Sequence, residues 1–235
     1  MTIHDSFEGA IYIATVVELA KKFGVQLISG DDFNEYSKII EEGRPGQPVG
    51  VPFDPKFVDI KSGEGFWIIG RNDCGELVFT QAVRLIRVEG ENFCDFMREK
   101  FVEFPPAGMP IDFERSFYHP GPAARRLGGT MAYHGDVWMK SDDDKYRGTG
   151  LSSVLARLAL VTALMTWAPD HMFGFIIRKL AFKGLGEREG YMHSEPATLH
   201  WFAKDRQDPM VAHMCWMNRE DLRHLLTIPA ESVMA

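Results

Sequence analysis

The stretch from Leu151 to Trp167 constrains the fold more than any other part of the sequence. Its apolar side chains follow the 3.6-residue period of a helix, and further apolar residues widen the stripe over most of the helix circumference. The stripe consists of Leu151, Val154, Leu155, Leu158, Thr162 and Met165, and it is widened by Leu160, Val161 and Leu164. A helix with so much apolar surface has to be covered, so we expect it to be pressed against a β-sheet.

The segments around this stretch predict both helices and strands. Residues 10–23 show helical spacing up to Gly24, and Asp32 is an N-cap candidate for a second helix that ends at Gly43. Two β-rich runs within 65–88 are separated by turn-forming residues, as in an antiparallel hairpin. Further helices are expected at 92–104, 178–189 and after Asn218, strands at 130–140, 172–177, 197–203 and 211–216, and irregular structure at 105–129.

This mixture of elements indicates an α/β or α+β protein. The chain of 235 residues has the size of one domain, so we interpret 1–235 as a single domain with an inserted helix and proline-rich loop at about 89–128. With 45% hydrophobic and 25% charged residues, the composition excludes a disordered chain, a collagen-like chain and a long coiled coil.

Charge and cysteine content exclude further classes of protein. The chain has 33 acidic and 26 basic residues and a net charge of −7, so we expect no nucleic acid as partner. Cys74, Cys94 and Cys215 form no close pair, which predicts neither a disulfide framework nor a zinc ribbon. No export signal or membrane-spanning run is found, so we expect a cytoplasmic protein without a membrane partner.

The segment from Lys145 to Ser153 is the part most suggestive of chemistry, because a strand there gives way to the long helix. Gly148 and Gly150 allow the backbone to pass close to a ligand, and a helix start presents unpaired N–H groups and a partial positive charge. Lys145 and Arg147 add cationic donors. The segment therefore predicts a phosphate or diphosphate site, and a tight turn without a ligand stays open as the alternative.

Two common phosphate-binding motifs do not match this segment. A nucleotide P-loop requires a lysine before the Ser or Thr, and that lysine is absent. A dinucleotide site requires a third glycine where Ser153 stands. It also requires an acidic residue at the end of the next strand, whereas Asp170 precedes that strand. The third option is coenzyme A, and it rests on a family resemblance.

The run Arg147-Gly148-Thr149-Gly150-Leu151-Ser152 resembles the R/Q-x-x-G-x-G/A signature of GCN5-related N-acetyltransferases, the GNAT superfamily. The order of helices and strands over roughly 10–220 is also similar to that family. The resemblance implies a mixed, mostly antiparallel central sheet flanked by helices, and direct transfer of an acetyl group from acetyl-CoA, as co-substrate, to a small-molecule amine without a metal. The cofactor-binding residues implied are Val137, Met139, Lys145, Arg147, Gly148, Thr149, Gly150, Leu151 and Ser152.

The strand before the signature supplies candidate catalytic residues. Strand alternation places His134, Asp136, Trp138 and Lys140 on one polar face, which is expected to line a cleft. His134 is a candidate to accept the proton of the amine, and Asp136 is expected to attract a cationic acceptor. The alternative is that both side chains face solvent or bond neighbouring loops and have no catalytic role. Glu114 is a further candidate base.

The family often has a tyrosine four residues before a Gly-Phe pair, as general acid toward the leaving thiolate. Gly190-Tyr191 resembles that pair here, and Gly186 occupies the tyrosine position. Tyr191 or His193 is a candidate to replace the usual acid, and departure of the thiolate toward water stays open. The missing tyrosine also leaves open a binding module that holds acyl-CoA without transferring the acyl group.

Several features leave the substrate open. The 89–128 insertion is long enough to cover a longer acyl chain, as in N-acyl amino acid or acyl-homoserine lactone synthases. The acidic run 142–144 indicates a cationic amine. Arg178, Lys179 and Lys183 either meet the 3′-phosphate of coenzyme A or form a solvated helix face. His193, Glu195 and His200 do not have metal-site spacing, so no metal is expected, and a homodimer stays open.

Overall fold

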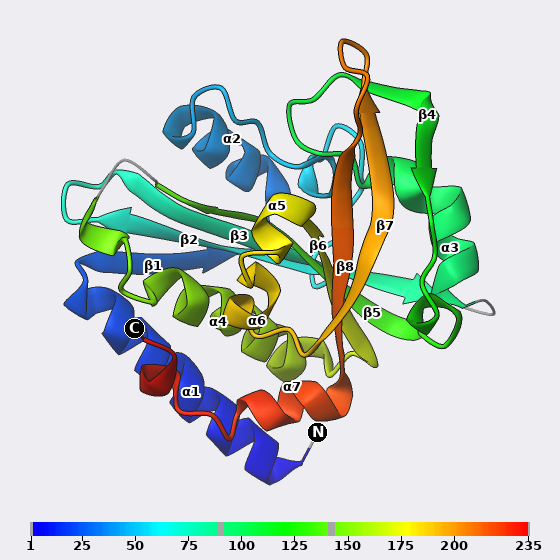
Figure 1. Cartoon of the computed structure of the whole chain (residues 1–235). Coiled ribbons are helices and arrows are strands. Elements are labelled where there is room, and N and C mark those ends of the chain that lie inside the picture. Colours follow the sequence, from blue (N-terminus) through cyan, green and yellow to red (C-terminus); the bar gives the residue numbers. More distant parts are fainter. Residues whose placement is uncertain (1, 89–91, 141–143, 235) are drawn as a thin grey trace.

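The computed structural model describes residues 2–88, 92–140 and 144–234, and their strands form one eight-stranded sheet (Figure 1). The strand order is β1-β2-β3-β5-β6-β8-β7-β4, and all neighbouring pairs are antiparallel except β5 and β6. The strands are β1 (Val25–Gly30), β2 (Gly65–Asn72), β3 (Leu77–Val88), β4 (Ile111–Tyr118), β5 (Gly129–Met139), β6 (His171–Ile177), β7 (His193–Ala203) and β8 (Met210–Asn218). The expected mixed, mostly antiparallel sheet is confirmed.

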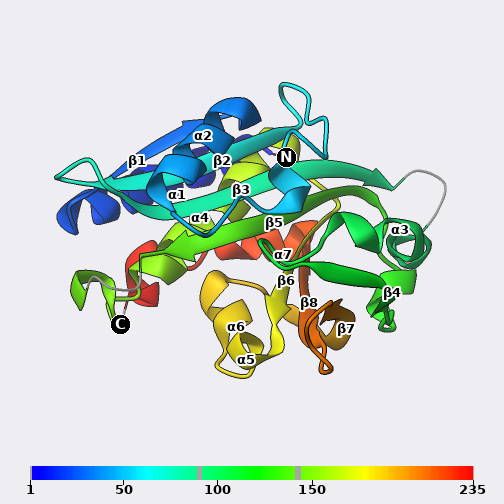
Figure 2. The ribbon, with the colours of Figure 1, turned by 90° about the horizontal axis from the view of Figure 1, so that it is seen from above.

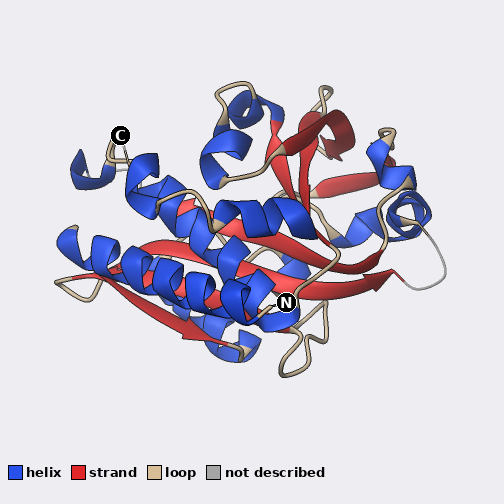
Figure 3. Cartoon of the chain, turned by 90° about the horizontal axis from the view of Figure 1, so that it is seen from below, coloured by secondary structure: helices blue, strands red, loops and turns tan. Residues whose placement is uncertain are grey.

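Helices cover both faces of this sheet. Helices α1 and α4 lie on one face, which Figure 3 shows from below, and α2 and α3 lie on the other. The helices are α1 (Ile3–Lys22), α2 (Phe33–Gly43), α3 (Phe93–Lys100), α4 (Leu151–Trp167), α5 (Arg178–Ala181), α6 (Leu185–Glu189) and α7 (Arg219–Leu225). None of the helices in the described ranges is both long and apolar enough to span a membrane.

Helix α4 is buried as its composition predicts. It packs on β3 and β5 and is flanked by α1, α6 and α7. Leu151, Leu155, Leu160 and Leu164 are fully buried, so the wide apolar stripe serves two separate core clusters. The expected helix against a sheet is confirmed.

Two strands lie where the sequence predicts none. β1 follows Gly24 and pairs with β2, but its six residues do not alternate clearly between polar and apolar. β4 lies inside the stretch expected to be irregular and pairs with β7 at only a few positions, around a shift of register. The prediction of irregular structure was wrong there, because a short edge strand among prolines has almost no local signal.

The parallel pair β5 and β6 separates after a short contact. The two strands pair from Met131↔His171 to Tyr133↔Phe173, and beyond this point β5 stays with β3 while β6 stays with β8. Figure 2 shows β6, β8 and β7 turning away from β5. The sheet is therefore open between the carboxyl-terminal halves of the two strands.

Candidate active site

A pocket of about 310 Å³ lies at this opening between β5 and β6. Residues 134–137 of β5 and 174–177 of β6 line it, together with Phe53 and Phe104 on one side and Leu185 and Tyr191 on the other. The facing edges of the two strands have no strand partner at these positions. Backbone N–H and C=O groups on such edges need hydrogen-bonding partners, so the opening is suited to an extended polar ligand.

A β-bulge at Asp136 shapes the pocket. Ala82 pairs with Gly135 and Thr80 with Trp138, so two residues of β5 oppose Gln81 alone, and Asp136 has a φ of 53°. The bulge shifts the alternation of side chains by one position. His134 and Asp136 therefore point to opposite faces of the sheet, and the predicted common polar face of β5 was wrong.

The side chain of Asp136 is held by residues from the α2 side of the sheet. Its carboxylate accepts hydrogen bonds from Tyr36 Oη at 2.6 Å and Arg44 Nη2 at 3.0 Å, and its carbonyl accepts one from Thr80 Oγ1. The side chains of Arg44 and Asp136 are only 4% and 5% exposed. Burial raises the pKa of Asp136 and the Arg44 charge opposes this. A carboxylate paired in this way anchors the bulge and is not available to attract a cationic acceptor.

His134 lies on the α4 side of the sheet in a defined hydrogen-bonding chain. Gln81 Nε2 donates to the Leu155 carbonyl, so Gln81 Oε1 faces His134 Nε2 at 3.1 Å. An amide oxygen accepts only, and Nε2 therefore carries the ring proton. His134 Nδ1 is left as the acceptor for the Tyr191 hydroxyl at 3.2 Å. Burial lowers the pKa of His134 to about 4, so the ring is neutral at pH 7.

Tyr191 presents its hydroxyl at the point where β5 and β6 separate. A Cβ atom on Gly174 would lie 2.7 Å from this hydroxyl and 2.9 Å from the His134 carbonyl oxygen, so glycine is required for the approach. Gly186, which stands where the resembling family often has a tyrosine, packs against Cys215, whose Sγ would lie 2.9 Å from an added Cβ. His193 is not among the pocket-lining residues and contacts Asp221 instead.

Glu189 is a pocket residue that the sequence analysis missed. It ends α6, lines the same pocket as Tyr191 and is only 6% exposed. Burial raises its pKa to about 7. Only tertiary burial distinguishes Glu189 from its neighbour Glu187, which is exposed, so the sequence carries no signal for it.

We expect Glu189→Gln to stabilise the protein at alkaline pH. A carboxyl whose pKa is raised by folding opposes the folded state once pH rises above its ordinary value, and the full penalty is present above about pH 7. The variant should therefore gain roughly 1–2 kcal/mol of unfolding free energy at pH 8.5 and nothing at pH 4.5. Urea unfolding at both pH values measures this, with Glu187→Gln as control. An equal effect at the two pH values would contradict it.

The glycine-rich loop lies beyond the carboxyl end of β5, just before α4. Gly148 and Gly150 have φ of 68° and 74°, in the left-handed region that favours glycine. Thr149 Oγ1 donates to the Tyr146 carbonyl and accepts from Leu151 N, which holds the turn against the helix start. Arg147 and Ser152 are exposed there, as are Lys145 and Gly148, whereas Leu151 is buried and packs under the loop.

The loop follows the carboxyl end of β5, and the pocket reaches as far as Val137, close to that end. At about 3.3 Å per residue, Val137 and Met139 are about 7 Å apart along β5. Val137 lines the pocket, whereas Met139 packs toward the core cluster of α1 and α4. A ligand that contacts both the pocket and the glycine-rich loop has to be long and narrow. Positions 142 and 143 of the acidic run 142–144 lie outside the described residues.

The other predicted residues lie away from this pocket. Glu114 is exposed on β4. Arg178 and Lys179 line a second pocket beside the β7–β8 hairpin, whereas Lys183 is exposed and lines neither of these two pockets. His193, Glu195 and His200 contact Asp221, the Ala123 backbone and the Phe117 ring respectively. Among the described residues, no three His, Cys, Asp or Glu side chains are grouped as metal ligands.

The chain is thus an α/β protein whose central sheet opens between β5 and β6, beside the start of the buried helix α4. No protein-family model and no curated protein sequence matches the chain. Solved structures with a similar course of the chain include NAA60 of Arabidopsis thaliana in complex with acetyl-CoA, with 11% identity, a TM-score of 0.47, and coverage of 83% of this chain and 98% of that one.

Two bacterial structures are similar to a comparable degree. The spermidine/spermine N-acetyltransferase SpeG of Vibrio cholerae has 9% identity and a TM-score of 0.46, covering 86% of this chain and 96% of that one. A putative acetyltransferase of Acinetobacter baylyi has 15% identity and a TM-score of 0.44, covering 83% and 92%. Similarity at this level does not transfer an activity, so the function has to be inferred from the site itself.

Proposed function

We propose that the protein is an acyl-CoA-dependent N-acyltransferase of the GNAT type, which transfers an acetyl group from acetyl-CoA to an amine. The observation that carries this proposal is the opening between β5 and β6, together with a glycine-rich loop between the end of β5 and the start of α4. One end of this surface offers backbone N–H groups and Arg147 to a diphosphate, and the other end offers a pocket to a thioester.

The described residues supply the groups that the transfer requires. The loop 147–152 holds the diphosphate, and the flexible arm of coenzyme A lies along the unpaired edge of β5. The thioester then reaches the pocket beside Tyr191 and Glu189. Backbone N–H groups at the parted edges are the donors available to the thioester oxygen, which becomes negative as the amine adds.

The reaction balances with these residues. The amine nitrogen forms a C–N bond with the thioester carbon, the C–S bond breaks, and the sulfur takes the proton of the Tyr191 hydroxyl. The amine loses one proton, for which Glu189 with its pKa of about 7 is a suitable acceptor, and solvent returns a proton to Tyr191. His134 stays neutral and holds the Tyr191 hydroxyl in place through Nδ1, so it acts as a positioning residue, and the hydroxyl turns its proton from Nδ1 to the sulfur as the C–S bond breaks.

A second function is supported by a separate observation. Phe104, Pro105 and Pro106, which belong to the 89–128 insertion, form part of the pocket wall. An apolar wall of this kind favours an acyl chain longer than acetyl, and a comparison of acetyl-CoA with octanoyl-CoA as donors distinguishes the two.

A binding module without transfer activity would bind acetyl-CoA and release no thiol with any amine.

Titration calorimetry with acetyl-CoA tests the carrier site directly. We expect saturable binding, and Arg147→Ala should weaken it by about tenfold because a charged donor to the diphosphate is lost. Arg71→Ala is the matched control, since Arg71 lies in the β2–β3 hairpin and bonds the Gly75 carbonyl. No heat with wild-type protein, or equal affinity of wild type and Arg147→Ala, would contradict the proposal.

A further inference from the structure

A second pocket of about 600 Å³ borders the pocket between β5 and β6. Ile177, Trp201 and Met210 line both of them, so the two pockets share a wall. The second pocket lies between the start of α5 and the β7–β8 hairpin. A molecule bound there has a short route to the proposed thioester position.

Three cations from two separate elements line this second pocket. Arg178 and Lys179 come from α5 and Arg206 from the hairpin, whereas Asp208 is the only carboxylate among the lining residues. Within the described residues, the three cationic side chains have no ion pair. The pocket wall therefore has an excess of positive charge, which favours an anionic ligand.

The same positive field acts on two neighbouring histidines. His200 of β7 and His213 of β8 have lowered pKa values, first because of burial and then because of nearby positive charge that includes Arg178. Both histidines are therefore neutral at pH 7 and do not add to the pocket charge. The charge that faces the pocket comes from the arginines and Lys179.

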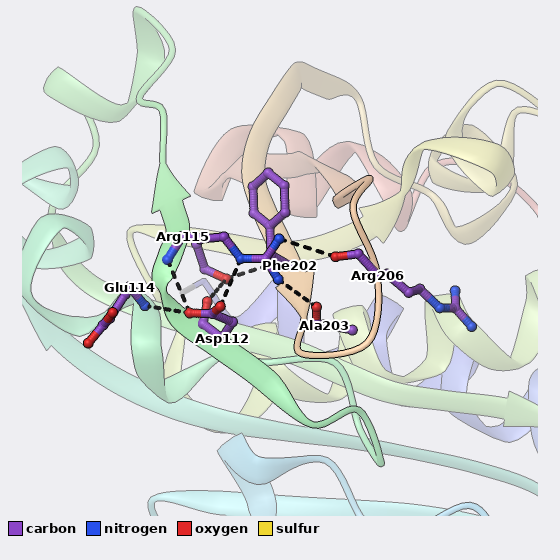
Figure 4. Close-up of polar contacts among 7 residues, drawn as sticks. Asp112, Glu114, Arg115, Phe202, Ala203 and Arg206 are labelled. Atoms are coloured by element: carbon purple, nitrogen blue, oxygen red, sulfur yellow. Dashed lines mark hydrogen bonds and ion pairs between the residues drawn. The ribbon is translucent and has the colours of Figure 1, made fainter.

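The hairpin that carries Arg206 is held in place by Arg115 (Figure 4). Arg115 Nε bonds the Asp112 carboxylate at 2.7 Å, and its Nη2 and Nη1 donate to the carbonyls of Ala203 at 2.9 Å and Arg206 at 3.2 Å. The Arg115 guanidinium also lies 5.0 Å from the Phe202 ring centroid. Figure 4 shows the Arg206 side chain extending away from this network, so its backbone is fixed while its guanidinium stays available.

We propose that the second pocket binds an anionic group of the amine acceptor, a carboxylate or a phosphate, while the amine reaches the first pocket. This inference rests on the proposed N-acyltransferase function and narrows its substrate class. It runs opposite to the cationic acceptor that the acidic run 142–144 indicates. Trp201 and Met210, at the shared wall, give the part of the acceptor between amine and anion an apolar surface.

Matched acceptor pairs test this substrate class. Each pair differs in the anion alone: L-phenylalanine and 2-phenylethylamine, 6-aminohexanoate and hexylamine, glycyl-phenylalanine and its amide, and O-phosphoethanolamine and ethanolamine. We expect kcat/KM for the anionic member of at least one pair to exceed that of its partner by about tenfold or more. The carboxylate and phosphate arms distinguish the two anions.

Variants assign the preference to this pocket. Arg206→Gln and Arg178→Gln should raise KM for the preferred anionic acceptor by about tenfold with kcat little changed, and leave its uncharged partner unaffected. Lys204→Gln is the matched control, because Lys204 is an exposed cation of the same hairpin that does not line the pocket. No preference for any anionic member, or an equal effect of Lys204→Gln, would overturn the inference.

Calorimetry separates this inference from the proposed function. The anionic acceptors are titrated into protein saturated with coenzyme A, and we expect binding that Arg206→Gln weakens. Absence of acetyl-CoA binding contradicts the proposed function. If the protein binds acetyl-CoA but prefers spermidine or hexylamine over every anionic acceptor, the inferred anionic acceptor class is wrong while the proposed N-acyltransferase function stands.

Discussion

Replacing Tyr191 with phenylalanine is expected to lower kcat by about 100-fold or more, the ordinary contribution of a positioned general acid. The hydroxyl is placed for this role by the His134 acceptor at 3.2 Å and by Gly174, which leaves room beside it. Phenylalanine keeps the ring that packs in the core and removes only the hydroxyl. KM for acetyl-CoA should change little, because the proposed diphosphate loop lies beyond the carboxyl end of β5 and does not contact the Tyr191 hydroxyl.

Steady-state rates of thiol release measure this effect. Tyr118→Phe is the control, since Tyr118 is a largely buried tyrosine of β4 whose hydroxyl has no hydrogen-bond partner among the described residues. Gln81→Leu should give an intermediate loss of kcat, because it frees the His134 tautomer that orients Tyr191. A kcat for Tyr191→Phe within threefold of wild type would show that the thiolate leaves without this acid.

Replacing Arg44 with methionine is expected to lower the free energy of unfolding by about 3–5 kcal/mol, the range found when one partner of a buried ion pair is removed. Arg44 supplies the only cation that contacts Asp136 in the described structure. It also donates to Thr80 Oγ1 and to the carbonyls of Gln47 and Pro48. Methionine fills much of the volume but leaves the carboxylate buried without a counter-charge.

The loss of unfolding free energy in the Arg44→Met variant should depend on pH. Burial already raises the pKa of Asp136, and the Arg44 charge opposes this, so removing Arg44 raises that pKa further. A raised folded-state pKa of an acid means that stability falls as pH rises, so the deficit should be larger at pH 8 than at pH 5. Urea unfolding at the two pH values measures it.

Two further variants complete this experiment. The double variant Arg44→Met/Asp136→Asn should recover at least half of the loss, because asparagine tolerates the left-handed backbone of this position and carries no charge. Arg71→Met, at a partly exposed arginine of the β2–β3 hairpin that makes no ion pair among the described residues, should change stability by less than about 0.5 kcal/mol. Equal losses for Arg44→Met at both pH values would contradict the role of the unpaired carboxylate.

Much of the fold could be predicted because its signals are local. The N-cap of α2 at Asp32, the β2–β3 hairpin and the helix over 151–167 each depend on residues a few positions apart. The glycine-rich loop is of the same kind, since Thr149 bonds the Tyr146 carbonyl and the Leu151 amide within one turn. Tyr191 was also named from the sequence, although only the structure places its hydroxyl in the pocket.

The rest of the site could not be predicted because its partners are distant in the chain. Tyr36 and Asp136 lie 100 positions apart, and Gln81 and His134 lie 53 apart. Strand alternation predicted a common polar face for His134 and Asp136. A single extra residue in the bulge reversed that prediction, since the side-chain period of a strand is two.

The amino-acid sequence by itself determined where helices and turns begin, and it located a candidate diphosphate loop, because capping, turn geometry and periodicity are short-range effects. Tertiary structure alone decided that β5 and β6 separate after three residue pairs and that Arg44 and Tyr36 bind the Asp136 carboxylate. It also decided that Glu189 is buried, which raises its pKa to about 7. Desolvation and strand pairing depend on what the folded chain brings together from a distance, and no local pattern encodes them.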